Sequence, residues 1–345
     1  MFTPSPFHAR RPGLVAPVRV DAAGIDGPTR GQARGPRWRT TGCGLVVPSH
    51  VVPTPQQRAV EAAVVLKDDE AVTGWAALAW EGGTWFDGTF DGTRHRPVTV
   101  VARRNVRAQP GFEVSQEFLH PEQIRLVDGL QITMAVRSVT FEMRYAEGLG
   151  AAIEAVDMAC YSDLVGIDEV AAYVSALGPV TGIQQARDAL LEAEENSWSP
   201  RETRMRGVWT RRAGLPRPRC NIPVFTLDGH HVGTPDLIDP GIGVVGLYHG
   251  ESHLNLVGAA ADIKKEAAYR DVGLEPVSML ATDWNDLPDF TRRLVAAVRR
   301  ARARQAPREW TVETPAWWTP TETVAQRRAL ASWERERYLR YRRAA

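Results

Sequence analysis

Polar side chains that can bind a metal ion or move a proton gather around one stretch of this sequence, residues 233–250 (GTPDLIDPGIGVVGLYHG). Asp236 stands at the head of a short segment, and an Asp-Pro-Gly turn then leads into an apolar run, residues 242–248. Two strands joined by a tight turn predict a buried hairpin with its polar residues at one end. The Asp236 carboxylate would lie beside the end of the second strand. That end carries His249, Glu251 and His253.

A helix is predicted to begin upstream at Ser199-Pro200-Arg201-Glu202. Ser199 is expected to cap it, Pro200 suits its first position, and Glu202 can reach back to the Ser199 amide. The segment is also strongly basic, with enough positive charge to hold a phosphate backbone if the residues share a face. Its arginines are Arg201, Arg204, Arg206, Arg211 and Arg212.

These two stretches are part of a longer segment that resembles a known group of proteins. Residues 196–302 resemble the C-terminal domain of a large actinobacterial group of proteins related to the type IV abortive-infection antitoxins. Four motifs fall in that group's order and spacing: SWSPRETRMRGVW, GLPRPRCNIPVF, VGTPDLIDPGIGVVGLYHGESHL and DIKKEAAYRDVGLEPVSML. That domain is similar to very-short-patch-repair endonucleases, within the PD-(D/E)XK nuclease superfamily. Residues 27–190 resemble the same group more weakly.

The resemblance implies a metal-dependent phosphodiesterase site. Asp236 matches the principal metal ligand on the hairpin, and Glu202 matches the glutamate that leans toward the metal from the first helix. Lys265 takes the family's basic position and would stabilise the phosphate. Mg²⁺ or Mn²⁺ would be the ion, and a metal-bound water would attack in line.

The chain departs from the family at the strand end, where two acids are usual. Leu247 stands where the glutamate is expected and His249 where the aspartate is expected. Three possibilities follow: Glu251 takes the vacant ligand position, His249 acts as a nitrogen ligand for a softer ion such as Mn²⁺ or Zn²⁺, or the site is inactive. The family commonly keeps a histidine at the place of His253. Because leucine supplies no ligand, the resemblance predicts the fold more directly than the activity.

Composition sets further bounds. The chain has 345 residues, 43% of them hydrophobic and 24% charged, which suits two packed domains. The net charge is only +1, so a nucleic-acid surface must be local. Three cysteines far apart, with no apolar run of about 18 residues, predict a cytoplasmic protein with reduced thiols and no membrane partner. No Walker loop or dinucleotide fingerprint appears, so no small-molecule cofactor is expected.

The predicted architecture is α/β (α+β), with a helical and β N-terminal domain before a PD-(D/E)XK-like mixed sheet flanked by helices. A helix at 55–65, an apolar helix at 72–80, strands at 97–103, 112–118 and 128–133, and helices over 138–191 are expected. Acidic residues on the later helices, Asp157 and Glu142, are expected to be solvated or capping. The expected segments are a flexible tail (1–26), an antitoxin-like domain with a winged-helix remnant whose wing is 38–47 (27–195), a nuclease-like domain (196–306) and a basic C-terminal helix (307–345).

The sequence therefore predicts a nucleic-acid-associated protein with reduced or lost hydrolysis and DNA as its partner. The alternative is a non-catalytic antitoxin or transcriptional regulator of a toxin–antitoxin or phage-defence system, with a toxin protein as partner.

Overall fold

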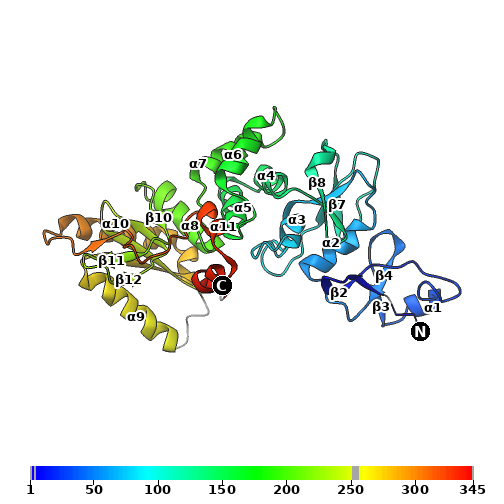
Figure 1. Cartoon of the computed structure of the whole chain (residues 1–345), viewed down its shortest axis with the longest axis horizontal. Helices are drawn as coiled ribbons and strands as arrows, with labels where there is room; N and C mark the ends of the chain where they lie inside the picture. Colours follow the sequence, from blue (N-terminus) through cyan, green and yellow to red (C-terminus); the bar gives the residue numbers. More distant parts are fainter. Residues whose placement is uncertain (1, 4, 251–255, 344–345) are drawn as a thin grey trace. The chain divides into compact units, whose positions relative to one another are not determined.

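The computed structural model describes residues 2–3, 5–250 and 256–343. The chain divides into two compact units (Figure 1): unit 1 comprises residues 1–147 and 168–188, and unit 2 comprises residues 148–167 and 189–345. Helices are combined with mixed sheets, so the expected mixed α/β class is confirmed. None of the described helices has both the length and the apolar composition of a membrane span.

A five-stranded mixed sheet forms the centre of unit 1, in the order β7-β6-β5-β9-β8. Its strands are β5 (Ala71–Thr73), β6 (Val98–Val101), β7 (Phe112–Ser115), β8 (Ile124–Val127) and β9 (Leu130–Thr133). The helices are α1 (Arg30–Ala33), α2 (Pro55–Ala63), α3 (Gly74–Trp80), α4 (Ala135–Tyr145), α6 (Ile167–Ala176) and the first part of α7 (Ile183–Glu192). Two antiparallel pairs complete the unit: β1 (Pro6–His8) with β2 (Arg11–Val15), and β3 (Trp38–Thr40) with β4 (Val46–Pro48).

Most elements predicted for unit 1 are present. Thr54 caps α2 by accepting a hydrogen bond from the Gln57 amide at 3.1 Å, and the three predicted strands correspond to β6, β7 and β9. The predicted apolar helix at 72–80 begins later, at Gly74, because residues 71–73 form strand β5. Trp75 and Trp80 are buried, which confirms their prediction as core residues rather than exposed stacking platforms.

Residues 1–26 contain the β1–β2 pair, whereas the sequence predicted a flexible tail. Long-range partners hold this segment, and no local pattern in the sequence reveals them. The Gln57 side chain bonds to both the amide and the carbonyl of Val15, at 3.0 and 2.9 Å. The Arg11 guanidinium lies 4.4 Å from the centre of the Trp80 ring and donates to the Trp80 carbonyl at 2.8 Å.

Unit 2 is built on a four-stranded mixed sheet in the order β10-β13-β14-β15. Its strands are β10 (Arg219–Cys220), β13 (Leu237–Asp239), β14 (Val244–His249) and β15 (Glu275–Leu280). A smaller antiparallel sheet has the order β12-β11-β16, formed by β11 (Val224–Thr226), β12 (His231–Gly233) and β16 (Trp310–Thr311). The helices are α5 (Leu149–Tyr161), α8 (Pro200–Gly207), α9 (Leu256–Asp271), α10 (Leu287–Ala303), α11 (Val324–Ala329) and α12 (Ser332–Tyr338).

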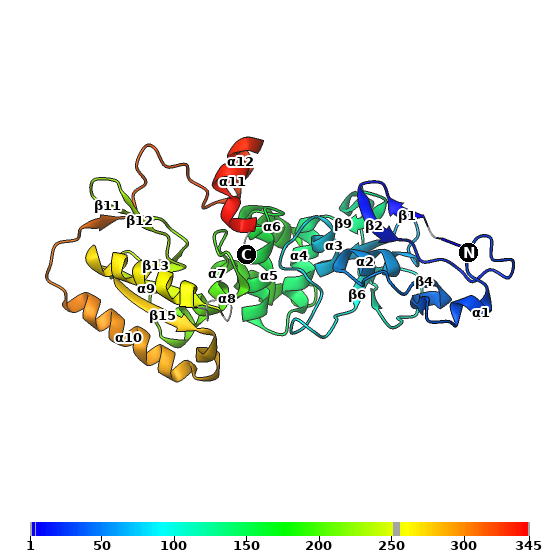
Figure 2. The same ribbon diagram turned by 90° about the horizontal axis from the view of Figure 1, so that it is seen from below.

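The predicted order of helix, hairpin, helix, strand and helix is confirmed in α8, β13–β14, α9, β15 and α10. Strand β13 pairs antiparallel with β14, and α9 carries the chain across to β15, which lies parallel to β14. Helices α9 and α10 cover opposite faces of this sheet (Figure 2). Because side chains alternate along a strand, Leu237 and Val244 face α8 and α10, whereas Val245 and Leu247 face α9.

Helix α8 approaches β14 closely at Gly246. A Cβ atom at this position would lie 2.7 Å from Cε of Met205 and 3.3 Å from the Trp209 ring. The sequence therefore keeps a glycine in the middle of an otherwise bulky apolar strand, and the glycine sets how close the helix stands to the sheet.

A buried ion pair joins α8 to α5. Asp157 accepts hydrogen bonds from Arg206 Nη2, Thr203 Oγ1 and the Glu194 amide, each at 2.7 Å, and both charged side chains are at most 4% exposed. Glu142, in unit 1, is also buried, where it accepts from the Trp75 amide at 2.8 Å. The two carboxylates were predicted to be solvated or capping. Both are buried rather than solvated, and Glu142 caps the first turn of α3 through the Trp75 amide.

The C-terminal segment differs from the single basic helix that was predicted. It forms α11, α12 and a 3₁₀ turn (Arg340–Arg343), and Thr323 with Gln326 forms the capping box of α11. Asp163 anchors this segment through ion pairs to Arg327 at 2.6 Å and to Arg335 at 2.8 Å. Arg327 is fully buried, so removing Asp163 would leave a buried charge without its partner. Trp333, on α12, is 61% exposed.

These anchors explain why unit 2 extends beyond the predicted domain at 196–306. Asp157 and Asp163, on and just after α5, bind α8 and the C-terminal segment respectively. Residues 148–167 and 307–345 therefore belong to the same compact unit as the sheet.

We expect Asp157→Ala to lower the free energy of unfolding by about 3–5 kcal/mol, because it leaves the buried Arg206 charge without its partner. Glu154→Ala is the matched control, since Glu154 also joins α5 to α8, through Arg204, which is 48% exposed. That control is expected to cost at most about 1 kcal/mol. Urea unfolding measures both, and equal losses would contradict the role assigned to the buried pair.

Candidate functional site

Glu202 lies in the first turn of α8 and is held by three hydrogen bonds. Oε2 accepts from the Trp198 amide at 2.8 Å and from Asn221 Nδ2 at 2.6 Å, and Oε1 accepts from Ser199 Oγ at 2.9 Å. Ser199 Oγ in turn accepts from the Glu202 amide at 3.2 Å. The predicted cap is present, but the carboxylate bonds to the amide of Trp198 rather than to that of Ser199.

Asp236 immediately precedes β13, at the head of the hairpin as predicted. Its Oδ2 accepts from the Tyr248 amide at 2.5 Å, and its main-chain carbonyl accepts from the Asn221 amide at 3.0 Å. Asn221 therefore connects the two predicted metal ligands, since its side chain binds Glu202 and its backbone binds Asp236. The neighbouring Asp239 is a turn former, as predicted, and accepts from the amides of Gly241 and Ile242.

The two carboxylates influence each other's protonation. Burial, and then the nearby charge of Asp236, raise the pKa of Glu202 from its usual 4.5 to about 8. Burial also raises the pKa of Asp236, against the opposing effects of Lys265, the Tyr248 amide and His249. Burial therefore favours the protonated form of both carboxyl groups, and of Glu202 at neutral pH. A proton thus offsets part of the charge that a metal ion would neutralise in an active nuclease.

His249 is engaged by side chains of the protein. Its Nδ1 lies 2.9 Å from Asp262 Oδ2, and its Nε2 lies 3.1 Å from Ser278 Oγ. Ser278 Oγ donates to Glu266 at 2.5 Å. Both ring nitrogens therefore have partners on α9 and β15, and the predicted role of His249 as a nitrogen ligand would require it to give up one of them.

Leu247 is 1% exposed and packs on the face of the sheet that α9 covers, with Ile238, Val245 and Tyr269. Leu237 pairs with Gly246, so the continued register places Asp236 opposite Leu247. The resemblance implies a glutamate ligand at position 247, whereas the leucine here adds apolar atoms to the core under α9.

The remaining predicted site residues divide into two groups. Lys265, on α9, lies close enough to Asp236 for its charge to lower the pKa of that carboxyl group. Glu251 and His253 lie outside the described residues. Across residues 5–250 and 256–343, no group of three or more acidic, histidine or cysteine side chains is placed to hold a metal ion. Among the described residues the oxygen donors at this position are the carboxylates of Glu202 and Asp236, and Leu247 supplies none.

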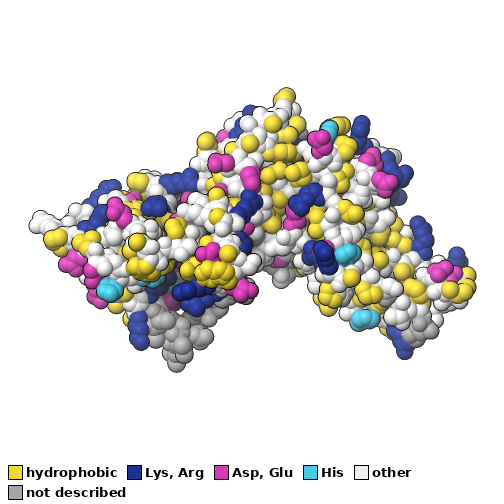
Figure 3. Space-filling model, viewed as in Figure 1, with side chains coloured by type: hydrophobic (Ala, Val, Ile, Leu, Met, Phe, Trp, Pro, Cys, Tyr) yellow, Lys and Arg dark blue, Asp and Glu magenta, His cyan; other side chains and the backbone are white. Residues whose placement is uncertain are grey.

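The arginines of α8 and its extension do not form the predicted phosphate-binding face. Arg204 pairs with Glu154, Arg206 with Asp157 and Arg211 with Glu192. Figure 3 shows basic and acidic side chains interspersed over the visible face of unit 2. Any binding of phosphate by this segment must therefore use its exposed arginines Arg201 and Arg212, which lie outside these three ion pairs.

Sequence reasoning missed three residues that organise the site: Asn221, Asp262 as the partner of His249, and Ser278. Asn221 has a left-handed backbone conformation, with φ of 49°, which asparagine adopts more readily than most residues. Its place in the motif GLPRPRCNIPVF gave a signal, but its contacts with the Glu202 carboxylate and the Asp236 main-chain carbonyl depend on the folded hairpin.

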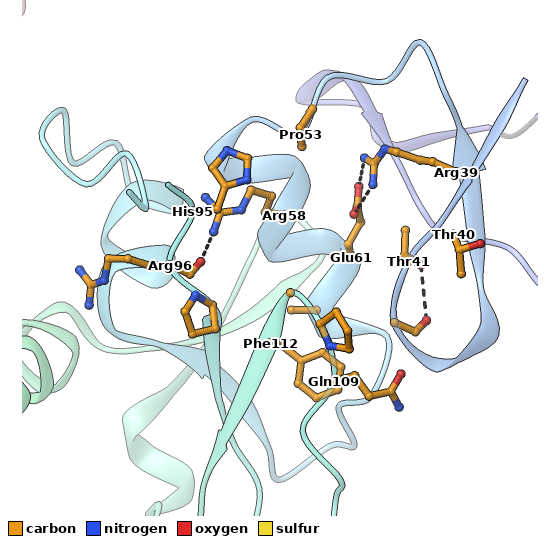
Figure 4. A pocket seen from close by; sticks show the side chains of 15 residues that line it. Arg39, Thr40, Thr41, Pro53, Arg58, Glu61, His95, Arg96, Gln109 and Phe112 are labelled. Atoms are coloured by element: carbon orange, nitrogen blue, oxygen red, sulfur yellow. Dashed lines mark hydrogen bonds and ion pairs between the residues drawn. The ribbon is translucent and has the colours of Figure 1, made fainter. Parts of the chain in front are cut away.

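Unit 1 contains a separate pocket of about 610 Å³, between the β3–β4 hairpin, α2 and the sheet (Figure 4). The guanidinium groups of this pocket are used within the protein: Arg39 pairs with Glu61, and Arg58 donates to the Gly88 carbonyl at 2.9 Å. None of the predicted site residues lines it. The candidate site is therefore the carboxylate pair of unit 2.

Comparisons with family models, with curated proteins and with solved structures find no match to this chain. The resemblance to the antitoxin-related group consequently stays an interpretation of the motifs.

The carboxylate pair predicts how stability depends on pH. Because the pKa of Glu202 is higher in the folded protein, folding takes up a proton between pH 4.5 and about 8, and stability falls as pH rises through this window. The slope is at most about 1.4 kcal/mol per pH unit for one proton. Glu202→Gln keeps hydrogen-bonding groups without the proton, so we expect a flatter profile and a variant more stable than the natural protein above pH 8.

Denaturant unfolding at several pH values measures this profile. Glu154→Gln, which removes a carboxylate elsewhere on unit 2, is the control and should keep the natural slope. A Glu202→Gln profile as steep as the natural one would show that the proton is bound elsewhere.

The presence of Leu247 at the position of an expected ligand can be tested by restoring the acid and measuring the effect of Mn²⁺ on the Tm. We expect Leu247→Glu to lower the Tm in a chelator, because it buries a third carboxylate beside the existing pair. Millimolar Mn²⁺ should raise the Tm of this variant, since metal binding to the folded state stabilises it by about 2.7 kcal/mol at a concentration of 100 Kd.

Val245→Glu is the matched control, because Val245 is buried on the same face of the same strand. It should lose stability without rescue by metal. A Tm of the natural protein that Mn²⁺ also raises would show that the residues present already complete a metal site.

Proposed function

We propose that unit 2 binds nucleic acid through a PD-(D/E)XK-type fold that no longer hydrolyses the phosphodiester bond. The observation that carries this proposal is Leu247, which is 1% exposed in the apolar core at the position opposite Asp236. Hydrolysis in this superfamily needs oxygen ligands at that position, and an alkyl side chain supplies none.

The arrangement of unit 2 supports the choice of fold. Helix α8 carries Glu202, the β13–β14 hairpin brings Asp236 to the strand end, and α9 returns with Lys265 near Asp236. Such a constellation of helix, hairpin and crossover helix is what the motif resemblance predicts. The residues that deviate, Leu247 and His249, lie on one face of one strand.

The electrostatics support a binding role. An acidic site without a metal ion repels phosphate, but the proton on the carboxylate pair reduces that repulsion at neutral pH. Lys265 adds a positive charge beside the pair. Other arginines of the unit are exposed and can contact a phosphate backbone. They include Arg201, Arg212, Arg219, Arg299 and Arg302.

The test uses the full chain with labelled single-stranded and duplex DNA, first in a chelator and then with Mg²⁺ or Mn²⁺. We expect binding in every case, weaker at higher salt, and DNA of unchanged length. Lys265→Gln should weaken binding by roughly five-fold, consistent with losing one charged contact near phosphate. Lys264→Gln, the exposed neighbour on α9, is the matched control and should change affinity little.

Two results would overturn the proposal. Cleavage by the natural protein that Asp236→Ala abolishes would establish an active nuclease with a ligand from elsewhere in the chain. Binding of neither kind of DNA would remove nucleic acid as the partner and favour a partner protein.

A further inference from the structure

A pocket of about 460 Å³ lies beside the carboxylate pair, entirely within unit 2. The loop before α8, the β10–β11 segment and the C-terminal residues form its walls. This volume lies in the range of pockets that hold small organic ligands. Asn221 lines this pocket, and its side chain donates to Glu202 at 2.6 Å.

Aromatic rings form much of the lining: Trp198, Trp317, Trp318 and Tyr338. Trp318 packs edge-on against Phe225 with ring centres 5.1 Å apart, so its ring is held by the core of the small sheet. Trp317 is 61% exposed, an unusual position for so large an apolar ring. Rings with one held face and one open face are suited to stacking against another flat ring system.

Asn221 contributes an unused hydrogen-bond acceptor. The side chain is 2% exposed, and its Nδ2 donates to the Asn196 carbonyl at 2.8 Å and to Glu202. Both partners are acceptors, which fixes the amide orientation and leaves Oδ1 as the free atom. Within the described residues, Oδ1 is buried and has no hydrogen-bond partner. A buried acceptor of this kind is costly unless a ligand with an N–H group satisfies it.

Two positively charged side chains that could bind phosphate line the pocket. Arg337 and Arg340 line the pocket and are exposed, whereas Glu322 is the one carboxylate among its described lining residues. The pocket therefore combines aromatic faces, a buried acceptor and two guanidinium groups. A nucleotide offers the complement of each: a flat ring system, an N–H edge and a phosphate.

We propose that this pocket receives one unstacked nucleobase of a nucleic-acid strand, with the base against Trp317 and its N–H edge on Asn221 Oδ1. Arg337 and Arg340 bind the adjoining phosphate. The proposal rests on the proposed function, because it names the contact by which unit 2 holds a strand. It assigns a binding role to C-terminal residues outside the nuclease-like motifs.

The experiment compares two labelled dodecamers of equal charge with the full chain, in a chelator. One is oligo(deoxyadenylate), and the other is a sugar-phosphate strand without bases. We expect the natural protein to bind the strand with bases at least about tenfold more tightly, as base–aromatic stacking and one hydrogen bond would give. Trp317→Ala should remove most of this preference and leave the affinity for the abasic strand unchanged.

Trp333→Ala is the matched control, because Trp333 is also 61% exposed but does not line the pocket. It should keep the natural preference. Arg340→Gln should weaken the binding of both strands about equally, whereas Lys264→Gln, exposed on α9 and outside the pocket lining, should weaken them less.

The outcomes separate this inference from the proposed function. Equal affinity of the natural protein for the two strands, or a preference that survives Trp317→Ala, would overturn the nucleobase pocket while nucleic-acid binding stands. Binding of neither strand would overturn both. The loss of preference in Trp317→Ala alone, with Trp333→Ala unaffected, is the result that the pocket predicts.

Discussion

The buried ion pair between Asp157 and Arg206 fixes α8 against α5, and the position of Glu202 depends on it. Arg206 stands one turn after Glu202 on the same short helix, so the ion pair sets both the depth and the rotation of that helix. Gly246 then allows the helix to approach β14 closely. Charge and packing together bring Glu202 within electrostatic reach of Asp236.

The carboxylate pair is held by hydrogen bonds within the protein. Asn221 and Trp198 donate to Glu202 and the Tyr248 amide donates to Asp236, while burial raises the pKa of both carboxyl groups. Leucine at 247 adds apolar contacts to the core under α9, where a ligand would have added a third buried charge. This apolar packing is the basis of the proposal that unit 2 binds nucleic acid without hydrolysing it.

The sequence predicted the parts of this fold that local patterns determine. Helix caps at Thr54 and Ser199, the β13–β14 hairpin and the order of elements in unit 2 followed from spacing and turn residues. It could not predict partners far apart in the chain, such as Asp163 with Arg327. For the same reason the C-terminus was predicted as a single basic helix, although its arginines anchor two short helices. Asn221 was not recognised as the link between Glu202 and the main chain of Asp236.

The most direct test of the account is photocrosslinking of a bromodeoxyuridine-containing strand to the full chain in a chelator and then with Mg²⁺, with mass mapping of the peptides. We predict crosslinks within residues 310–322 and 332–340, and an intact strand under both conditions. Crosslinks confined to unit 1, or a strand cut when Mg²⁺ is added, would contradict the assignment of unit 2 as a nucleic-acid-binding unit without hydrolysis.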